Sequence, residues 1–328
     1  MSEPAAGYAA LPAAQVEVDD DVEAHSLLED DQTSASTSLT SSVLDFEWKH
    51  GRRYGKGQYS FPNDDIEQIR LRAIHYVFYR LLEDSYIRAP INPHGLNILD
   101  IGTGTGDWAI DVGDQYPGAT ITGNDISPIQ PAWVPPNVKF IVDNVEAEWV
   151  EPIKYDYIHC RYMAGSIKDW PRLLRQIYDN LKPGGWVELQ ESVNTLYSED
   201  DSVKPDDPLV RMMDCLKDAC NQIGRTMDPA PHFRHWLDDA GFTHIREERF
   251  KLPVGAWPKD PRLKEIGALM GINMREGVAA FTAVLFTEVL KWPREEVELF
   301  NMSVREASQR MGTHYLFDFL VTMGQKPE

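Results

Sequence analysis

The sequence predicts an α/β protein built on a parallel, doubly wound β-sheet. From about residue 96, short apolar segments alternate with segments of helical periodicity, a pattern typical of βαβ units. A glycine-rich turn, GTGTG at residues 102–106, joins the first of these strands to a helix. The second strand ends on Asp125, at about twenty residues from that turn, as in nucleoside-binding folds of this class. These observations predict one large nucleoside-binding domain.

Each element follows from its own pattern of apolar residues and turn residues. Strands are expected where apolar and β-branched residues cluster, at residues 96–102, 119–125, 138–144, 155–162, 184–192, 243–255 and 314–327. Helices are expected where apolar residues recur at helical spacing, at residues 106–116, 170–181, 205–224, 231–241, 261–290 and 293–311. The sheet domain is therefore assigned to residues 96–328, with helical insertions at about 195–230 and 258–312.

The chain before the sheet domain divides into two parts. Residues 1–40 are rich in Ala, Ser, Thr, Asp and Glu without apolar periodicity, and we expect this acidic region to be disordered. Residues 41–95 are expected to form an aromatic, basic flap followed by a helix that Asn63 and Asp64 cap. We expect that helix to bury one apolar stripe, made of Ile66, Ile69, Ala73, Val77 and Leu81.

Charge and composition narrow the range of partners. Lys and Arg number 32 against 52 Asp and Glu, which gives a net charge of −20 and disfavours nucleic acids and anionic membranes. The most apolar run, residues 277–290, is too short to span a bilayer and suggests a buried helix. No signal peptide is visible, so we expect a cytoplasmic protein, with a nuclear location left open.

The cysteines and histidines give little sign of a metal centre. Three cysteines, Cys160, Cys215 and Cys220, include no CxxC pair, which argues against a disulfide framework or zinc site. His232 and His235 stand three residues apart, a spacing that a metal site could use, but no third ligand is evident. We therefore expect no metal.

The glycine-rich turn fits S-adenosylmethionine better than a dinucleotide. Glycines there let the backbone turn sharply and approach a ligand closely. A dinucleotide fingerprint has the spacing GxGxxG, whereas this turn has GxGxG and is followed by Asp107. Asp100 and Asp107 flank the turn with negative charge, which suits the ammonium and sulfonium groups of S-adenosylmethionine and opposes a pyrophosphate. An NAD-dependent oxidoreductase is the disfavoured alternative.

Two further sites follow the next strands. Asp125 can accept hydrogen bonds from both ribose hydroxyls, although a simple turn-capping role is the alternative. Asp143 and Asn144 close the third strand, where they can bond the adenine amino group; the alternative is a solvated turn.

These sites, in this order, resemble the class I methyltransferases and, more narrowly, the LaeA-like fungal methyltransferases. The resemblance runs from about Ser38 to the C-terminus. It rests on the segments GRRY…YSFPNDDIEQ, NDISPIQPAWVPPNV, RYMAGSIKDW, LKPGGWVE and HYLFDFLVTMGQKP.

The resemblance implies a Rossmann-like, seven-stranded, mostly parallel sheet whose last strand is antiparallel. It also implies that Gly102, Gly104 and Gly106 contact the methionine part of S-adenosylmethionine and that Asp125 contacts the ribose. Asn144 departs from the family, which has a second acid there, so Asp143 would carry more of the adenine contact. The helical insertion before the last strand would form a lid over the acceptor pocket, and Tyr54 would cover the cofactor as part of a flap.

The acceptor side yields weaker candidates. His159 ends the fourth strand and could act as a base for an oxygen acceptor, although a packed histidine bonded to the backbone is the more common case. Arg161 and Tyr162 share its location. Glu191 ends the fifth strand, where it could contact substrate; a solvated strand end is the default. Six tryptophans could line a pocket for a flat acceptor or simply belong to the core: Trp108, Trp133, Trp149, Trp170, Trp236 and Trp257.

A basic cluster in the flap allows two further interpretations. Its members are Lys49, His50, Arg52, Arg53 and Lys56. It could be a localisation signal or a nucleic-acid patch, but a cofactor-side flap fits the family better and fits the acidic chain.

The expected function is methyl transfer from S-adenosylmethionine to a small molecule, in fungal secondary metabolism. Orientation of the acceptor alone can supply roughly 7–11 kcal/mol of the rate acceleration, so the sequence need not contain a recognisable catalytic base. The alternative is a nuclear regulator of the velvet-complex type, in which protein partners matter more than turnover.

Overall fold

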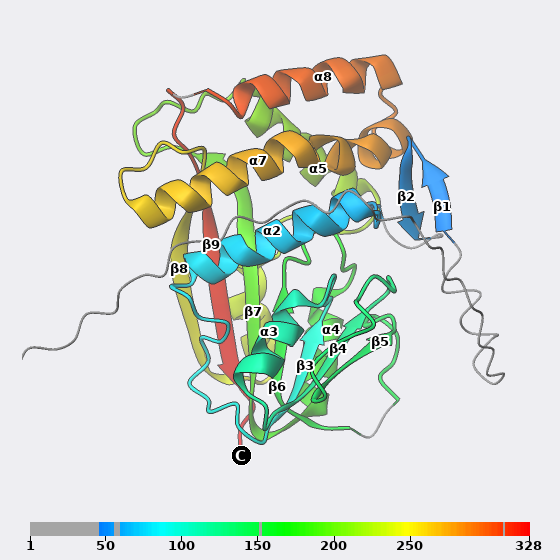
Figure 1. Ribbon diagram of the computed structural model, residues 1–328, viewed down its shortest axis with the longest axis vertical. Coiled ribbons are helices and arrows are strands. Elements are labelled where there is room, and N and C mark those ends of the chain that lie inside the picture. Colours follow the sequence, from blue (N-terminus) through cyan, green and yellow to red (C-terminus); the bar gives the residue numbers. More distant parts are fainter. Residues whose placement is uncertain (1–45, 56–59, 151–152, 311) are drawn as a thin grey trace, which may run out of the picture.

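The computed structural model describes residues 46–55, 60–150, 153–310 and 312–328. The region expected to be disordered, residues 1–40, lies outside the described residues, as does Lys56. The described chain contains a seven-stranded sheet with the order β5-β4-β3-β6-β7-β9-β8 (Figure 1). Its strands are β3 (Asn97–Ile101), β4 (Thr120–Asp125), β5 (Val138–Val142), β6 (Tyr155–Arg161), β7 (Leu181–Tyr197), β8 (Thr243–Val254) and β9 (Tyr315–Gln325).

The strand directions confirm the predicted fold class. The pairs β3–β4, β3–β6, β4–β5 and β6–β7 are parallel, whereas β9 is antiparallel to both of its neighbours, β7 and β8. The last strand is therefore the antiparallel one, as expected. The fifth predicted strand is longer than its pattern indicated, because β7 continues for 17 residues to Tyr197.

Side-chain alternation gives the sheet two different faces. In β6, Ile158 and Cys160 join the core that packs against α4 (Trp170–Asn180) and α6 (Phe233–Asp239). Tyr157, next to them in the sequence, joins the core on the opposite face, with residues of α2 (Asp65–Leu81) and α3 (Asp107–Gln115). Since successive side chains of a strand point to opposite faces, His159 and Arg161 share the α2 and α3 face with Tyr157.

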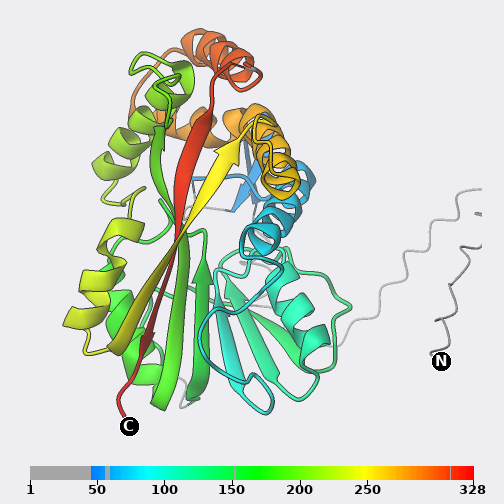
Figure 2. The ribbon, with the colours of Figure 1, turned by 90° about the vertical axis from the view of Figure 1, so that its left-hand side faces the viewer.

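Helical insertions cover the far ends of the longest strands. Figure 2 shows β7, β8 and β9 rising out of the sheet into a helical region. That region contains α5 (Pro208–Gln222), α7 (Pro261–Val284) and α8 (Arg294–Ala307). These helices lie above the carboxyl ends of β3, β4 and β6.

The most apolar run lies inside a longer helix than the run itself suggested. α7 continues as a π-helix, Leu285–Val289, and the 29 residues from Pro261 to Val289 are long and apolar enough to cross a membrane by length and composition alone. Half of the most apolar window is buried, and α7 packs against α2, β8 and α8. This packing agrees with the expected core helix.

The flap is a β-hairpin, which the sequence did not predict. Strands β1 (Phe46–Lys49) and β2 (Arg52–Gly55) pair in antiparallel register. Their cations are occupied within the protein: Arg52 binds Asp64 through two bonds of 2.5 and 2.8 Å, and Lys49 lies 3.6 Å from Glu288. The described part of the basic cluster therefore anchors the hairpin to α2 and α7's π-helical end.

The buried face of α2 differs from the predicted stripe. Val77 and Leu81 are buried as expected, but Ile66 and Ile69 are 63% and 68% exposed. Glu67 is buried instead, where it receives bonds of 2.5 and 3.0 Å from Arg70, and Arg70 also donates to Asn273 of α7 at 2.8 Å. A buried ion pair, invisible to an apolar pattern, fixes the rotation of this helix.

We predict that this ion pair is strongly coupled. Glu67→Gln should lower the free energy of unfolding by about 3 kcal/mol or more, because it leaves the Arg70 guanidinium buried without its charge partner. The double variant Glu67→Leu with Arg70→Met should cost less than the two single variants added together. Chemical denaturation of the wild type, Glu67→Leu, Arg70→Met and the double variant measures the coupling energy.

The exposed Arg294–Glu298 pair provides a matched control, since both side chains are 65% exposed. Its double-mutant cycle should give a coupling of about 0.5 kcal/mol or less. Additive effects of the Glu67 and Arg70 substitutions would contradict the prediction.

Candidate active site

A cavity of about 440 Å³ opens at the carboxyl ends of β3, β4 and β6, the edge at which open α/β sheets bind their ligands. Its volume lies within the range of small-molecule sites. One part is bordered by the glycine-rich turn and by the ends of the strands, and the other extends beneath α2, α5 and α7. The cavity brings together ten sequence candidates: Asp100, Gly102, Gly104, Trp108, Asp125, Asp143, Asn144, His159, Arg161 and Tyr162.

The three glycines of the turn have different roles. All three adopt positive φ, and a Cβ on Gly102 would meet the Met163 sulfur at 2.2 Å, whereas one on Gly106 would meet the Phe140 ring at 2.4 Å. On Gly104 the nearest atom would belong to Leu71, at 3.9 Å. Gly102 and Gly106 are thus required by protein packing, and Gly104 leaves bare backbone toward the cavity.

Asp125, the last residue of β4, is hydrogen-bonded to the glycine-rich turn. Its Oδ2 accepts from the Gly104 N–H at 2.9 Å and its Oδ1 accepts from the Ser127 N–H at 2.8 Å. Burial raises the pKa of the Asp125 carboxyl, although these two backbone donors oppose the increase. A carboxylate has about four acceptor sites, so Asp125 can still accept hydrogen bonds from a vicinal diol, as expected.

Asp100 and His159 form a buried pair at the floor of the cavity. They are direct neighbours in the β3–β6 register, and Asp100 Oδ1 lies 2.7 Å from His159 Nδ1 while Asp100 Oδ2 accepts from the Thr103 hydroxyl at 2.6 Å. The Trp108 indole stacks on the His159 imidazole with 3.9 Å between ring centroids. His159 Nε2 is buried and has no hydrogen-bond partner among the described residues. The ring is therefore held against Asp100, not against a backbone group.

A second histidine, His75 of α2, forms a chain of hydrogen bonds on the same face. Arg161 Nη2 lies 2.7 Å from His75 Nδ1, and His75 Nε2 lies 2.8 Å from Asp111 Oδ2. The Tyr86 hydroxyl donates to the same Asp111 oxygen at 2.8 Å. Because Arg161 can only donate, His75 Nδ1 must accept and its Nε2 must carry the proton.

The residues expected to bind adenine lie at the rim of the cavity, and the tyrosine expected to cover the cofactor lies outside it. Asp143 and Asn144 are exposed, and the Asp143 N–H donates to the Asp125 carbonyl at 3.0 Å, which holds both residues at the cavity rim. Tyr54 is 2% exposed and does not line the cavity. Burial raises the pKa of its hydroxyl to about 12, so Tyr54 lies within the hairpin packing and does not cover the cavity.

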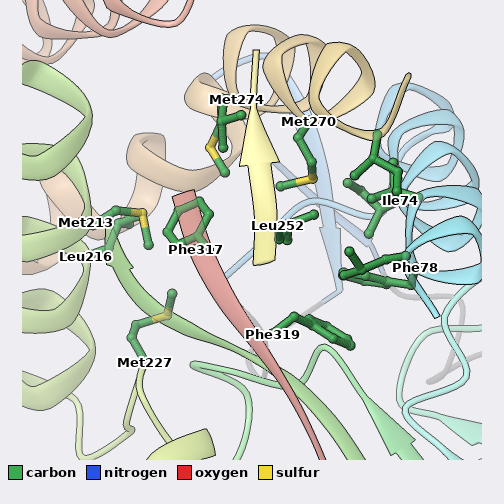
Figure 3. Packing of buried hydrophobic residues seen from close by; sticks show 14 of the residues in the cluster. Ile74, Phe78, Met213, Leu216, Met227, Leu252, Met270, Met274, Phe317 and Phe319 are labelled. Carbon is green, nitrogen blue, oxygen red and sulfur yellow. The ribbon is translucent and has the colours of Figure 1, made fainter. Parts of the chain in front are cut away.

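The deep part of the cavity is apolar and rich in methionine. Met213, Leu216 and Met227 face Met274 of α7 across the end of β9 (Figure 3), and Ile74 and Phe78 of α2 close the other side. We call this part the methionine chamber. Its lining includes Ile74, Phe78, Met212, Met213, Leu216, Met227, Met274 and Phe281. Polar groups at its border are the Glu67–Arg70 pair, Tyr162 and Asn194.

Most of the tryptophans named in the sequence analysis do not line the cavity. Of the six considered, Trp108 alone is among the lining residues of this cavity. Trp170 is a core residue in contact with Phe233, while Trp133 is 94% exposed. His232 stacks on Trp236 and His235 lies 3.3 Å from Asp239. No group of three or more metal-type ligands was found among the described residues.

Glu191 is buried, and the default of a solvated strand end is wrong. The strand continues past it, and the carboxylate is 2% exposed. Its Oε2 accepts from the Met163 and Ala164 N–H groups at 2.7 and 2.9 Å, which fixes the loop after β6. Tyr162, with φ of 58°, begins that loop. Glu191 thus shapes the site through the backbone.

Several site residues gave no sequence signal. His75 and Arg70 lie outside the apolar stripe that was predicted for their helix, and no motif singled out the methionines of α5 and α7. A search for polar residues on the buried face of α2 could have found the first two, but only after the rotation of the helix was known.

We predict that Glu191 makes stability depend on pH. Burial raises the pKa of Glu191 to about 7, against an unfolded value of 4.5, so the folded protein binds a proton more tightly. The contribution to stability is complete below about pH 4.5 and is lost as the pH rises through about 7. The free energy of unfolding should fall by about 1–3 kcal/mol over this window relative to Glu191→Gln.

A carboxyl ¹³C NMR titration, assigned with the Glu191→Gln spectrum, measures the same pKa directly. A midpoint near the unfolded value, together with parallel stability profiles for the two proteins, would refute the assignment.

Known proteins resemble the chain along nearly its whole length. The methyltransferase domain family (Methyltransf_23) matches residues 73–247, more than half of the 328 residues. Methyltransferase pytC of Aspergillus terreus is 58% identical over 97% of this chain and 98% of its own length. The secondary metabolism regulator LAE1 of Cochliobolus heterostrophus is 36% identical over 75% of this chain and 81% of its own. The protein-methionine methyltransferase laeA of Emericella nidulans is 32% identical, over 88% and 79% respectively. The chain therefore belongs to the LaeA-like fungal methyltransferases, class I enzymes whose methyl donor is S-adenosylmethionine.

Proposed function

We propose that this methyltransferase acts on a small, largely apolar molecule in fungal secondary metabolism. The observation that carries the proposal is the continuity of one cavity, from the bare backbone at Gly104 to the methionine chamber. A site of this kind buries most of a small ligand in apolar surroundings and orients it with few polar groups. Several relatives named secondary metabolism regulators support the metabolic setting.

The residues at the glycine-rich turn fit the cofactor. Bare backbone at Gly104 leaves room beside the chain, and three carboxylates, those of Asp100, Asp107 and Asp125, line the same part of the cavity. These negatively charged acceptors suit a ligand with an ammonium, a sulfonium and a vicinal diol, and they oppose a diphosphate. When bound, S-adenosylmethionine supplies an electrophilic methyl group.

Each of these side chains has a proposed task. Asp125 would accept from the ribose hydroxyls, and Asp143 and Asn144 at the rim would bond the adenine amino group. Asp100, whose orientation His159 and Thr103 fix, would face the ammonium group. His159 then acts as a positioning residue, since its Nδ1 is bonded to Asp100 and its Nε2 is buried.

The methionine chamber would receive the acceptor. Unbranched thioether side chains adapt to irregular or aromatic shapes, so the chamber favours an apolar body and tolerates variation in its outline. Arg70 and Tyr162 at the border offer donors to one oxygen of such a molecule. Neither is required to remove a proton when the acceptor atom is already nucleophilic.

A protein acceptor is the second candidate, since one relative is named a protein-methionine methyltransferase and another a regulator. The buried lining of the chamber favours the small molecule. Cellular location also distinguishes the two candidate functions, because a regulator of the velvet-complex type would accumulate in the nucleus with its partners.

We predict that label from S-adenosyl-[methyl-³H]methionine passes to a small product. The purified chain is incubated with extracts of a producing fungus, and the products are separated into organic and protein fractions. We expect label in the organic fraction with the wild type and none with Asp125→Ala, which should bind S-adenosylhomocysteine roughly 100-fold more weakly through lost charge-assisted bonds.

Met213→Gln provides the control for the acceptor side. It should raise the KM for the labelled acceptor several-fold and leave S-adenosylhomocysteine affinity unchanged, because Met213 lies in the chamber and not at the turn. Label confined to the protein fraction would transfer the proposal to the second candidate.

We predict that His159→Asn changes cofactor binding more than turnover. Loss of the ring that orients Asp100 should weaken S-adenosylhomocysteine binding roughly tenfold, with kcat at saturating cofactor reduced less than threefold and the pH profile retained. Calorimetry and steady-state kinetics give the two values. Unchanged affinity with a large fall in kcat and loss of the acidic limb would restore His159 as a base.

A further inference from the structure

Arg161 is a partly buried cation that has no ion-pair partner among the described residues. It lies at the end of β6, its guanidinium packs on the Phe78 ring at 5.3 Å, and it lines the cavity. Within the part of the chain that the structure describes, no carboxylate lies within 4.0 Å of it, whereas the neighbouring Arg70 is paired with Glu67. A buried charge is costly unless it is paired, so this guanidinium lacks a partner that a ligand could supply.

The hydrogen-bonded neighbour of Arg161 does not neutralise it. His75 accepts from Arg161 through Nδ1 and donates through Nε2 to Asp111. Burial lowers the pKa of His75, against the opposing effect of Asp111, so its ring stays neutral at physiological pH. The Asp111–His75 pair therefore holds the guanidinium in place without cancelling its charge.

Arg161 stays charged despite burial. Burial lowers its pKa to about 10, and the surrounding carboxylates of Asp100 and Asp107 oppose that decrease from a distance. At neutral pH the guanidinium is still protonated, so the cavity holds a fixed positive charge near two carboxylates.

The position of this charge selects one end of the ligand. Arg161 follows His159 by two residues on the same face of β6, and His159 is bonded to Asp100 at 2.7 Å. The ammonium and the carboxylate of an amino acid are attached to one carbon atom, so groups that bind them must lie close together. Asp100 and Arg161 have the opposite charges and the proximity that such a pair requires.

We propose that Arg161 binds the α-carboxylate of the cofactor's amino acid end, with His75 as the positioning residue that orients it. The inference rests on the proposed function. A carboxylate could also come from the acceptor, and the experiment distinguishes the two sources.

The test compares two ligands that differ in the amino acid end. S-adenosylhomocysteine carries the carboxylate, whereas 5′-methylthioadenosine keeps the adenosine and the thioether but lacks the amino acid. By isothermal titration calorimetry, Arg161→Met should weaken S-adenosylhomocysteine binding roughly 10- to 100-fold and change methylthioadenosine binding less than twofold. His75→Phe should give a smaller, several-fold loss for S-adenosylhomocysteine alone.

A third ligand isolates the carboxylate from the ammonium. Decarboxylated S-adenosylhomocysteine keeps the amine, and it should bind the wild type and Arg161→Met with equal affinity. Arg72→Met is the matched control, because Arg72 lies 3.8 Å from Asp107 but is 56% exposed; its removal should leave all three affinities within twofold.

Each result decides the matter. An equal loss of affinity for all three ligands would mean a structural role for Arg161 and overturn the proposal. A melting temperature that falls in both Arg161→Met and Arg161→Lys would have the same meaning. Unchanged S-adenosylhomocysteine affinity in Arg161→Met would also overturn it, and would assign the guanidinium to an acid group on the acceptor. If the wild type binds none of the ligands, the proposed function itself fails, which is a distinguishable outcome.

Discussion

The contact between Asp100 and His159 organises the floor of the site. It exists because β3 and β6 are adjacent in the sheet, because their register sets these two residues opposite each other, and because both point to the face that α2 and α3 cover. Two residues further along β6, the same alternation brings Arg161 to α2. A shift of one residue in this register would turn all of these side chains to the other face, so the chemistry depends on a backbone pairing that no single side chain determines.

α2 shows how packing can depend on polar contacts. The exposed positions of Ile66 and Ile69 and the buried Glu67 and Arg70 reverse what an apolar pattern indicates. The ion pair sets the rotation of the helix, and that rotation places His75 against Arg161 and Phe78 against the methionine chamber. A helix that precedes the sheet domain in the chain therefore forms one wall of its active site.

Much of the fold could be predicted from sequence because it is encoded locally. Strand and helix periodicity, the glycine-rich turn and Asp125 are short-range signals, and the resemblance supplied the antiparallel direction of the last strand. The parts that could not be predicted depend on distant contacts: the bond from His159 to Asp100 spans 59 positions, and that from Arg161 to His75 spans 86. Tyr54 was assigned to a flap over the cofactor, but the hairpin buries it, since its neighbours are the charged residues of α2 and α7's π-helical end.

The position of β9 has a consequence for how the chain acquires its structure. β9 follows every other strand in sequence, yet it lies between β7 and β8, and β8 has no other strand partner among the described residues. Until β9 is inserted, two long strands expose unpaired edges, which are prone to association with other chains. Pairings across such distances in sequence form slowly. The pairing of β9 with both neighbours is therefore what joins β8 to the rest of the sheet, and a chain that has not yet formed these pairings is the one most exposed to aggregation.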